Sequence, residues 1–281
     1  MIVDDPSELV RLSNGAMSVT TSPGLGSALV SLVDERSGRE WLAQAQHPRR
    51  LGALNFGSTA FSGWDEMFPT ITGDPRADHG DVWNRSWSVD SCSGTRLVTT
   101  VVSWTTGLVL TRDLSLDAAG STVMTMGYRV VNPTNAPVAF LWAAHPQFRC
   151  PPGTLVEVRN RDAWWRSDPA PAAPEELPLR PLEQVGRGGT GKWWSDPEGH
   201  ERWLTLRTPA NGSLALRWSG SVTRWIGVWV DYEALAAEPV IVPEPATAWL
   251  DDVISAERGG RAAIVPAGGS ESWRLVVEVG A

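Results

Sequence analysis

The chain has 281 residues, of which 42% are hydrophobic and 20% charged, and its formal net charge is −8 at pH 7. This length is sufficient to bury a substantial hydrophobic core. The negative charge disfavours nucleic acid and anionic membranes as partners, because both repel acidic proteins.

Alternating apolar and polar residues, bounded by turn residues, recur along the chain. This period of two is typical of antiparallel strands. We predict strands at residues 96–104, 108–114, 122–131, 138–145, 202–208, 213–218, 225–230, 240–243 and 272–279. A helical pattern is present only at 248–258. The pattern therefore predicts an all-β fold with very little helix.

The domain organisation follows from the continuity of this pattern. Residues 168–181 are rich in proline and alanine, but strand patterning resumes after them, so we interpret them as a surface loop. About a dozen strands exceed a simple seven-strand sandwich, and two large stacked antiparallel sheets accommodate them. We predict one domain over residues 1–281, as a monomer or a homodimer.

Other features predict the cellular setting. Residues 1–6 lack the basic and apolar regions of a secretory signal, and no apolar run approaches the roughly 20 residues that span a bilayer. We therefore expect a cytoplasmic protein with no membrane partner. Cys92 and Cys150 are far apart and are expected to be reduced. The four histidines, at positions 47, 79, 145 and 200, show no metal-ligand spacing.

A glycine-rich segment, residues 186–192, matches the glycine and lysine positions of a phosphate-binding P-loop. Trp193 stands where the magnesium-binding serine or threonine would be, and Pro197 prevents a helix from following directly. We interpret this segment as a mobile glycine loop with no nucleotide.

Two histidines lie beside aromatic residues, in a chain with 16 tryptophans. His79 follows Asp78 and precedes Gly80, which permits a turn that presents the imidazole to a cleft. His145 ends an apolar segment at Pro146. Imidazoles exchange protons near neutral pH and indole faces stack on sugar rings, so this combination indicates sugar chemistry. A loop histidine bonded to a backbone carbonyl and a core histidine remain the alternatives.

Acidic residues in apolar settings are the next candidates. Asp65 and Glu66 lie between Trp64 and Met67, where burial would raise a carboxyl pKa. Glu244 ends an apolar strand between two prolines. Charged residues are rare in such places unless they form an ion pair or take part in function. An ion pair with an arginine is the alternative. Trp64 and Trp83 lie within polar motifs and are candidate sugar platforms.

These segments resemble the aldose 1-epimerase (galactose mutarotase-like) family in sequence order. The residues that carry the resemblance are 12–19 with 26–34, Asp78–Trp83 with Trp87, Ala144–Phe148, Trp225–Val230, Pro243–Pro245 and Pro266–Trp273. The resemblance implies a β-supersandwich with a cleft on one sheet. Where many members have arginine, four residues after the first histidine, this chain has Trp83, with Arg85 two residues further on.

The resemblance implies an epimerase that interconverts the α and β anomers of a monosaccharide without a cofactor. Glu244 would take the proton from the O1 hydroxyl, His145 would protonate the ring oxygen O5, and His79 would support the developing charge. Asp65, Glu66 and Asp78 would bind hydroxyls, with Trp64, Trp83 or Trp229 as a stacking wall.

Two other functions stay open at this stage. Glu244 with Asp65 or Glu66 would form the carboxyl pair of a glycoside-cleaving enzyme. A sugar-binding or regulatory protein would keep the cleft without turnover. Arg149 is either a contact for an anionic substituent on the sugar or a surface residue.

Overall fold

The computed structural model describes residues 8–46, 51–52, 55–58, 61–72, 78–159, 161, 163–167, 173–196 and 202–280. Residues 1–6, His47, His200 and the first part of the predicted loop 168–181 lie outside these ranges. Within them, no helix has the length and apolar character needed to span a membrane.

The larger antiparallel sheet contains eleven strands over the described residues. In spatial order its main path is β1 (Val10–Ser13), β2 (Met17–Ser22), β3 (Ala28–Asp34), β5 (Trp64–Met67), β11 (Ala143–Pro146), β19 (Val240–Ala246), β18 (Trp225–Asp231), β15 (Thr190–Ser195) and β14 (Trp164–Arg166). Two short strands lie off this path, since β4 (Arg39–Glu40) pairs with β3 and β12 (Phe148–Arg149) with β19.

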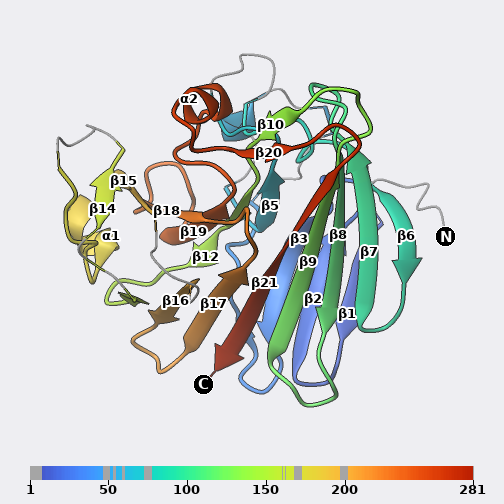
Figure 1. The fold of residues 1–281 in the computed structure, drawn as a ribbon. Helices are drawn as coiled ribbons and strands as arrows, with labels where there is room; N and C mark the ends of the chain where they lie inside the picture. The colour runs from blue at the N-terminus through green and yellow to red at the C-terminus, as the bar shows by residue number, and fades with distance from the viewer. Residues whose placement is uncertain are drawn as a thin grey trace.

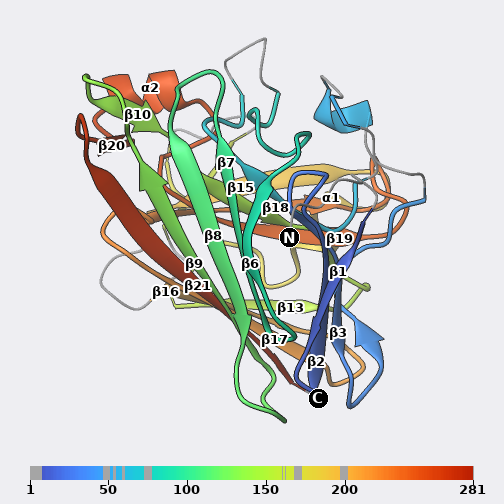
Figure 2. The same cartoon turned by 90° about the vertical axis from the view of Figure 1, so that its right-hand side faces the viewer.

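The second antiparallel sheet has eight strands over the same residues. Its order is β13 (Leu155–Val158), β16 (Arg202–Arg207), β17 (Ser213–Ser219), β21 (Ser270–Gly280), β9 (Val123–Val131), β8 (Val109–Leu116), β7 (Arg96–Val102) and β6 (Ser88–Cys92). Figures 1 and 2 show strands β1–β3 of the first sheet lying against β7–β9 of the second.

The remaining elements are short. Strands β10 (Val138–Phe140) and β20 (Ala263–Val265) pair with each other, and α2 (Val253–Arg258) lies beside them (Figures 1 and 2). The other helices among the described residues are α1 (Pro181–Val185) and the 3₁₀ turn η1 (Phe56–Ser58). The predicted all-β class, with large antiparallel sheets and very little helix, is confirmed.

The main core lies between the two sheets and follows from the period-two pattern. In β8, Leu110, Leu114 and Leu116 are buried, while Thr111 and Ser115 between them are only partly covered. Successive side chains of a strand point to opposite faces, so one face of each sheet is apolar and packs inward. The opposite face of the larger sheet does not pack against the second sheet.

Three segments differ from their predicted elements. The predicted strand 138–145 divides into β10 and β11, which belong to different sheets. The predicted helix 248–258 begins only at Val253, where the Asp252 side chain caps it by accepting from the amide of Ile254. The predicted glycine loop 186–192 ends at Gly189, because residues from Thr190 onward pair with β18.

Candidate functional site

A row of side chains crosses the outer face of the larger sheet, which is the face opposite the second sheet. Asp65 of β5 pairs with His145 of β11. The pairing of Ala143 with Ala246 places Glu244 of β19 next in the row. Antiparallel partners point to the same face, so strand pairing brings Asp65, His145 and Glu244 to adjacent positions from distant parts of the sequence.

The two prolines that flank Glu244 explain how β19 leaves room for His145. Proline has no N–H to donate to a sheet ladder. On the side of β11 and β12, the pairing of β19 runs through Ala246 on β11 and through Ile241 on β12, and both prolines lie between these points. On the other side, the pairing with β18 continues through both prolines. The sequence Pro243-Glu244-Pro245 thus places a carboxylate where the ladder on the β11 side is interrupted.

Glu244 is only 1% exposed and lies between a cation and an imidazole. Its Oε2 is 2.8 Å from Nζ of Lys192, and its Oε1 is 3.8 Å from Nε2 of His145. Burial raises the pKa of Glu244 to about 7, with Lys192 opposing and Asp251 adding to the increase. A carboxyl group with a pKa near 7 exchanges protons readily at neutral pH.

His145 is enclosed by aromatic rings. Phe56 packs edge-on against it at 5.3 Å between ring centroids, and Trp229 lies at 6.4 Å. The imidazole of His79 also meets it edge-on, at 5.7 Å. The structure therefore brings His79, His145 and Glu244 into one neighbourhood.

His79 is held by a strained turn and by its neighbour. Its backbone is left-handed, with φ of 60°, and its amide donates to the carbonyl of Ile71. The ring stacks on Phe56 at 4.2 Å, and Nδ1 lies 2.7 Å from Oδ1 of Asp78. The hydrogen bond to His79 keeps the pKa of Asp78 below its usual value. A carboxylate only accepts, so Nδ1 carries a proton and Nε2 is left for a ligand.

Gly80 is expected to be essential for this turn. A Cβ there would lie 2.1 Å from the carbonyl oxygen of Phe68, and the backbone φ is +85°. We expect Gly80→Ala to lower the free energy of unfolding by more than about 1 kcal/mol and to displace His79. Thermal and urea unfolding measure this loss. Gly94→Ala, with nothing within 4 Å of the added Cβ, is the matched control, and equal stability of the two variants would contradict the expectation.

Two of the predicted sugar contacts are wrong, because they point into the core. Trp64 is fully buried and packs edge-on against Phe148 within the main core. Glu66 is also fully buried, and its carboxylate accepts hydrogen bonds from residues inside the sandwich, namely Arg112, Tyr128 and Trp142. The alternation of β5 puts both on the face opposite Asp65. A pair of Glu244 with Glu66 for glycoside cleavage is excluded for the same reason.

The aromatic and acidic candidates on the site face differ in exposure. Trp83 is 3% exposed and donates its indole N–H to the Asp78 carbonyl, so it supports the turn rather than offering a stacking face. The two carboxylate oxygens of Asp78 accept hydrogen bonds from His79 and from the amide of Phe56. Trp229 is partly exposed and packs near Phe61. Among the three predicted tryptophans, Trp229 has the geometry of a sugar platform.

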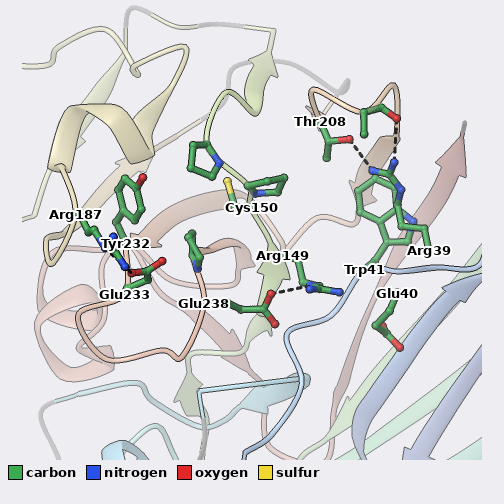
Figure 3. A pocket seen from close by; sticks show the side chains of 14 residues that line it. Arg39, Glu40, Trp41, Arg149, Cys150, Arg187, Thr208, Tyr232, Glu233 and Glu238 are labelled. Carbon is green, nitrogen blue, oxygen red and sulfur yellow. Dashed lines mark hydrogen bonds and ion pairs between the residues drawn. The ribbon is translucent and has the colours of Figure 1, made fainter.

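Arg85 and Arg149, whose roles the sequence did not decide, both lie outside this row of side chains. Arg85 donates to the carbonyl of Val102. Arg149 lines a separate pocket of about 430 Å³, where its side chain pairs with Glu238 at 2.7 Å (Figure 3). The pocket also holds an Arg187–Glu233 pair. Arg149 is thus a partnered residue of another pocket.

The sequence interpretation missed two charged residues of the site. Lys192 of β15 contacts Glu244 and also lies 2.6 Å from Asp251, in the turn after β19. A lysine beside two tryptophans is unusual without a partner, and this could have indicated a role for Lys192 from the sequence. The sequence pattern instead led us to assign Lys192 to a glycine loop. In the part of the chain that the structure describes, no three His, Cys, Asp or Glu side chains are grouped to hold a metal ion.

Comparison with solved structures identifies the fold. A galactose mutarotase related enzyme from Lactobacillus acidophilus aligns over 98% of both chains with 13% identity and a TM-score of 0.73. A galactose mutarotase-like protein from Clostridium acetobutylicum covers 100% of this chain and 98% of its own, with 15% identity and a TM-score of 0.72. A protein of Synechocystis sp. PCC 6803 covers 98% and 96%, with 14% identity and a TM-score of 0.74.

No protein-family model and no curated protein sequence matches the chain. The structural likeness extends over nearly the whole chain in each of these cases. The chain therefore has the galactose mutarotase-like fold, as its sequence resemblance implied.

Proposed function

We propose that this protein is an aldose 1-epimerase-like isomerase that interconverts the α and β anomers of a monosaccharide, in the cytoplasm. The observation that carries the proposal is the placement of Glu244 beside His145, with Oε1 at 3.8 Å from Nε2 and with His79 against the same imidazole. Anomer exchange needs one base and one acid on two nearby oxygens of the sugar, and no redox chemistry.

In the proposed reaction, the ionised Glu244 removes the proton of the anomeric O1 hydroxyl. The O1 electron pair forms the carbonyl as the C1–O5 bond breaks, and His145 gives its proton to O5. Rotation about C1–C2 and the reverse proton transfers close the ring on the other face. His79 would hydrogen-bond O5 or a neighbouring hydroxyl, with Asp78 fixing its orientation. Trp229 would stack on the sugar, and Asp65 would accept from a hydroxyl.

Exchange spectroscopy by NMR on equilibrated sugars tests the function directly. The full chain is expected to accelerate anomer exchange of at least one aldose in a panel of neutral, amino and phosphorylated sugars, above the rate in buffer alone. A binding protein without turnover would broaden or shift the sugar signals but leave the exchange rate at the buffer value. That result would overturn the proposed reaction.

The pH dependence of the rate is a second prediction. Burial raises the pKa of Glu244 to about 7, and a general base acts only in its ionised form. The rate should therefore fall as the pH decreases through about 7, as Glu244 takes up its proton. We refer to this fall as the acid limb. A rate constant that stays level from pH 8 down to about 5, near the pKa of an unperturbed glutamate, would contradict the assignment of Glu244.

A further inference from the structure

Lys192 reaches Glu244 across an intervening strand. Lys192 pairs with Trp229 in β18, and Glu244 pairs with Gly227 of the same strand. A Cβ at position 227 would lie 3.0 Å from Glu244 Oε2 and 3.1 Å from the Trp194 ring. The absence of a side chain at Gly227 therefore opens the space in which the ammonium and the carboxylate meet.

The contacts of Glu244 are divided between its two oxygens. Oε2 lies 2.8 Å from the ammonium of Lys192, and Oε1 is the oxygen nearest to His145. The ammonium lies 5.1 Å above the centre of the Trp194 ring, and its side chain is only 14% exposed. The attraction between two buried charges at this distance favours the orientation in which Oε2 faces the ammonium.

Asp251 holds the other side of the ammonium. Its Oδ1 lies 2.6 Å from Nζ, and its backbone carbonyl accepts from the amides of Ile71 and Thr72. The carbonyl of Ile71 in turn accepts from the amide of His79. The segment that carries His79 and the ion pair that holds Glu244 are thus joined by backbone hydrogen bonds.

We propose that Lys192 and Asp251 are positioning residues for Glu244: Lys192 holds Oε2 so that Oε1 faces His145 and the substrate, and Asp251 holds the ammonium of Lys192 in place. The inference rests on the proposed function of Glu244 as base. Lys192 itself is no nucleophile, since the neighbouring carboxylates outweigh the effect of burial and raise its pKa well above the usual value.

The charged and titratable groups around Glu244 come from several elements. Lys192 faces it from β15 and His145 from β11, and Asp251, in the turn after β19, contacts the ammonium of Lys192 and acts on Glu244 through its charge. Beyond His145 lie Asp65 in β5 and His79 in its turn. Lys192 favours the ionised form of Glu244 and Asp251 disfavours it, so the two positioning residues are expected to act in opposite directions.

The test measures anomer exchange against pH for the full-length chain and for two variants, Lys192→Met and Asp251→Asn. Loss of an opposite charge at this distance shifts a carboxyl pKa by about 1–3 units. We therefore expect Lys192→Met to move the acid limb upward by about 1–3 pH units, with activity recovering in alkaline buffer. Asp251→Asn should move the limb downward. Arg187→Met removes a 76% exposed cation that pairs with Glu233 and should leave the limb in place.

Infrared difference spectra, with Glu244→Gln as the reference, report the ionisation of Glu244 independently of turnover. If the carboxyl titration of Glu244 moves in opposite directions in the two variants while the acid limb does not, the positioning role stands and the proposed role of Glu244 as base fails. A second outcome overturns the positioning inference. In this outcome the acid limb coincides with the carboxyl titration of Glu244 in the unmodified protein, but neither variant shifts that titration. Equal losses of activity at every pH in both variants, with the titration unmoved, also overturn it.

Discussion

Replacing Glu244 by glutamine is expected to lower the rate of anomer exchange by about 10²–10⁴-fold, the usual contribution of a general base. Glutamine keeps the volume of the side chain and a polar oxygen near Lys192, but it cannot take a proton from O1. NMR exchange spectroscopy and polarimetry on freshly dissolved sugar measure the rate. The acid limb should disappear together with the activity.

The control for this variant is Glu238→Gln, which removes a carboxylate paired with Arg149 in the separate pocket. Its exchange rate should equal that of the unmodified protein. Circular dichroism and sugar affinity should be retained in Glu244→Gln, because the side chain volume is conserved. Near-normal exchange in this variant would show that another group is the base and would remove the basis of the proposed reaction.

The Glu66→Ala substitution is expected to cause the largest loss of stability, about 3–5 kcal/mol, by leaving a charge buried without its partner. Glu66 and Arg112 are 0% and 1% exposed, and their side chains meet at 3.0 Å. Arg112 belongs to β8 of the second sheet and Glu66 to β5 of the first. The pair therefore connects the two sheets inside the core, together with Tyr128 and Trp142.

Urea unfolding followed by tryptophan fluorescence measures this loss. The matched control is Asp113→Ala, which breaks an exposed pair with Arg96 at 2.6 Å and should cost about 0–1 kcal/mol. Glu66→Gln, which keeps the volume and one acceptor, should lie between the two. Equal unfolding free energies for Glu66→Ala and Asp113→Ala would contradict the role of Glu66 as a buried structural partner.

Local sequence determined the strands and part of the site. The alternation in β8, β9 and β21 is a property of neighbouring residues, so the sequence alone predicted strands close to their observed bounds. The Pro-Glu-Pro sequence around Glu244 and the Asp-His-Gly sequence around His79 are likewise short motifs. Their local chemistry indicated acid–base groups before their positions in space were known.

Tertiary structure decided which of these residues share a face. Trp64, Asp65 and Glu66 are adjacent in sequence and equally plausible as sugar contacts, but pairing of β5 with β11 turns only Asp65 toward His145. Lys192 lies in a glycine-rich segment that the local pattern predicted to be a loop, and only its pairing with β18 makes it part of a strand. Sheet register is set by contacts between distant segments, and a shift of one residue exchanges the two faces. The site face was therefore beyond the reach of local sequence patterns.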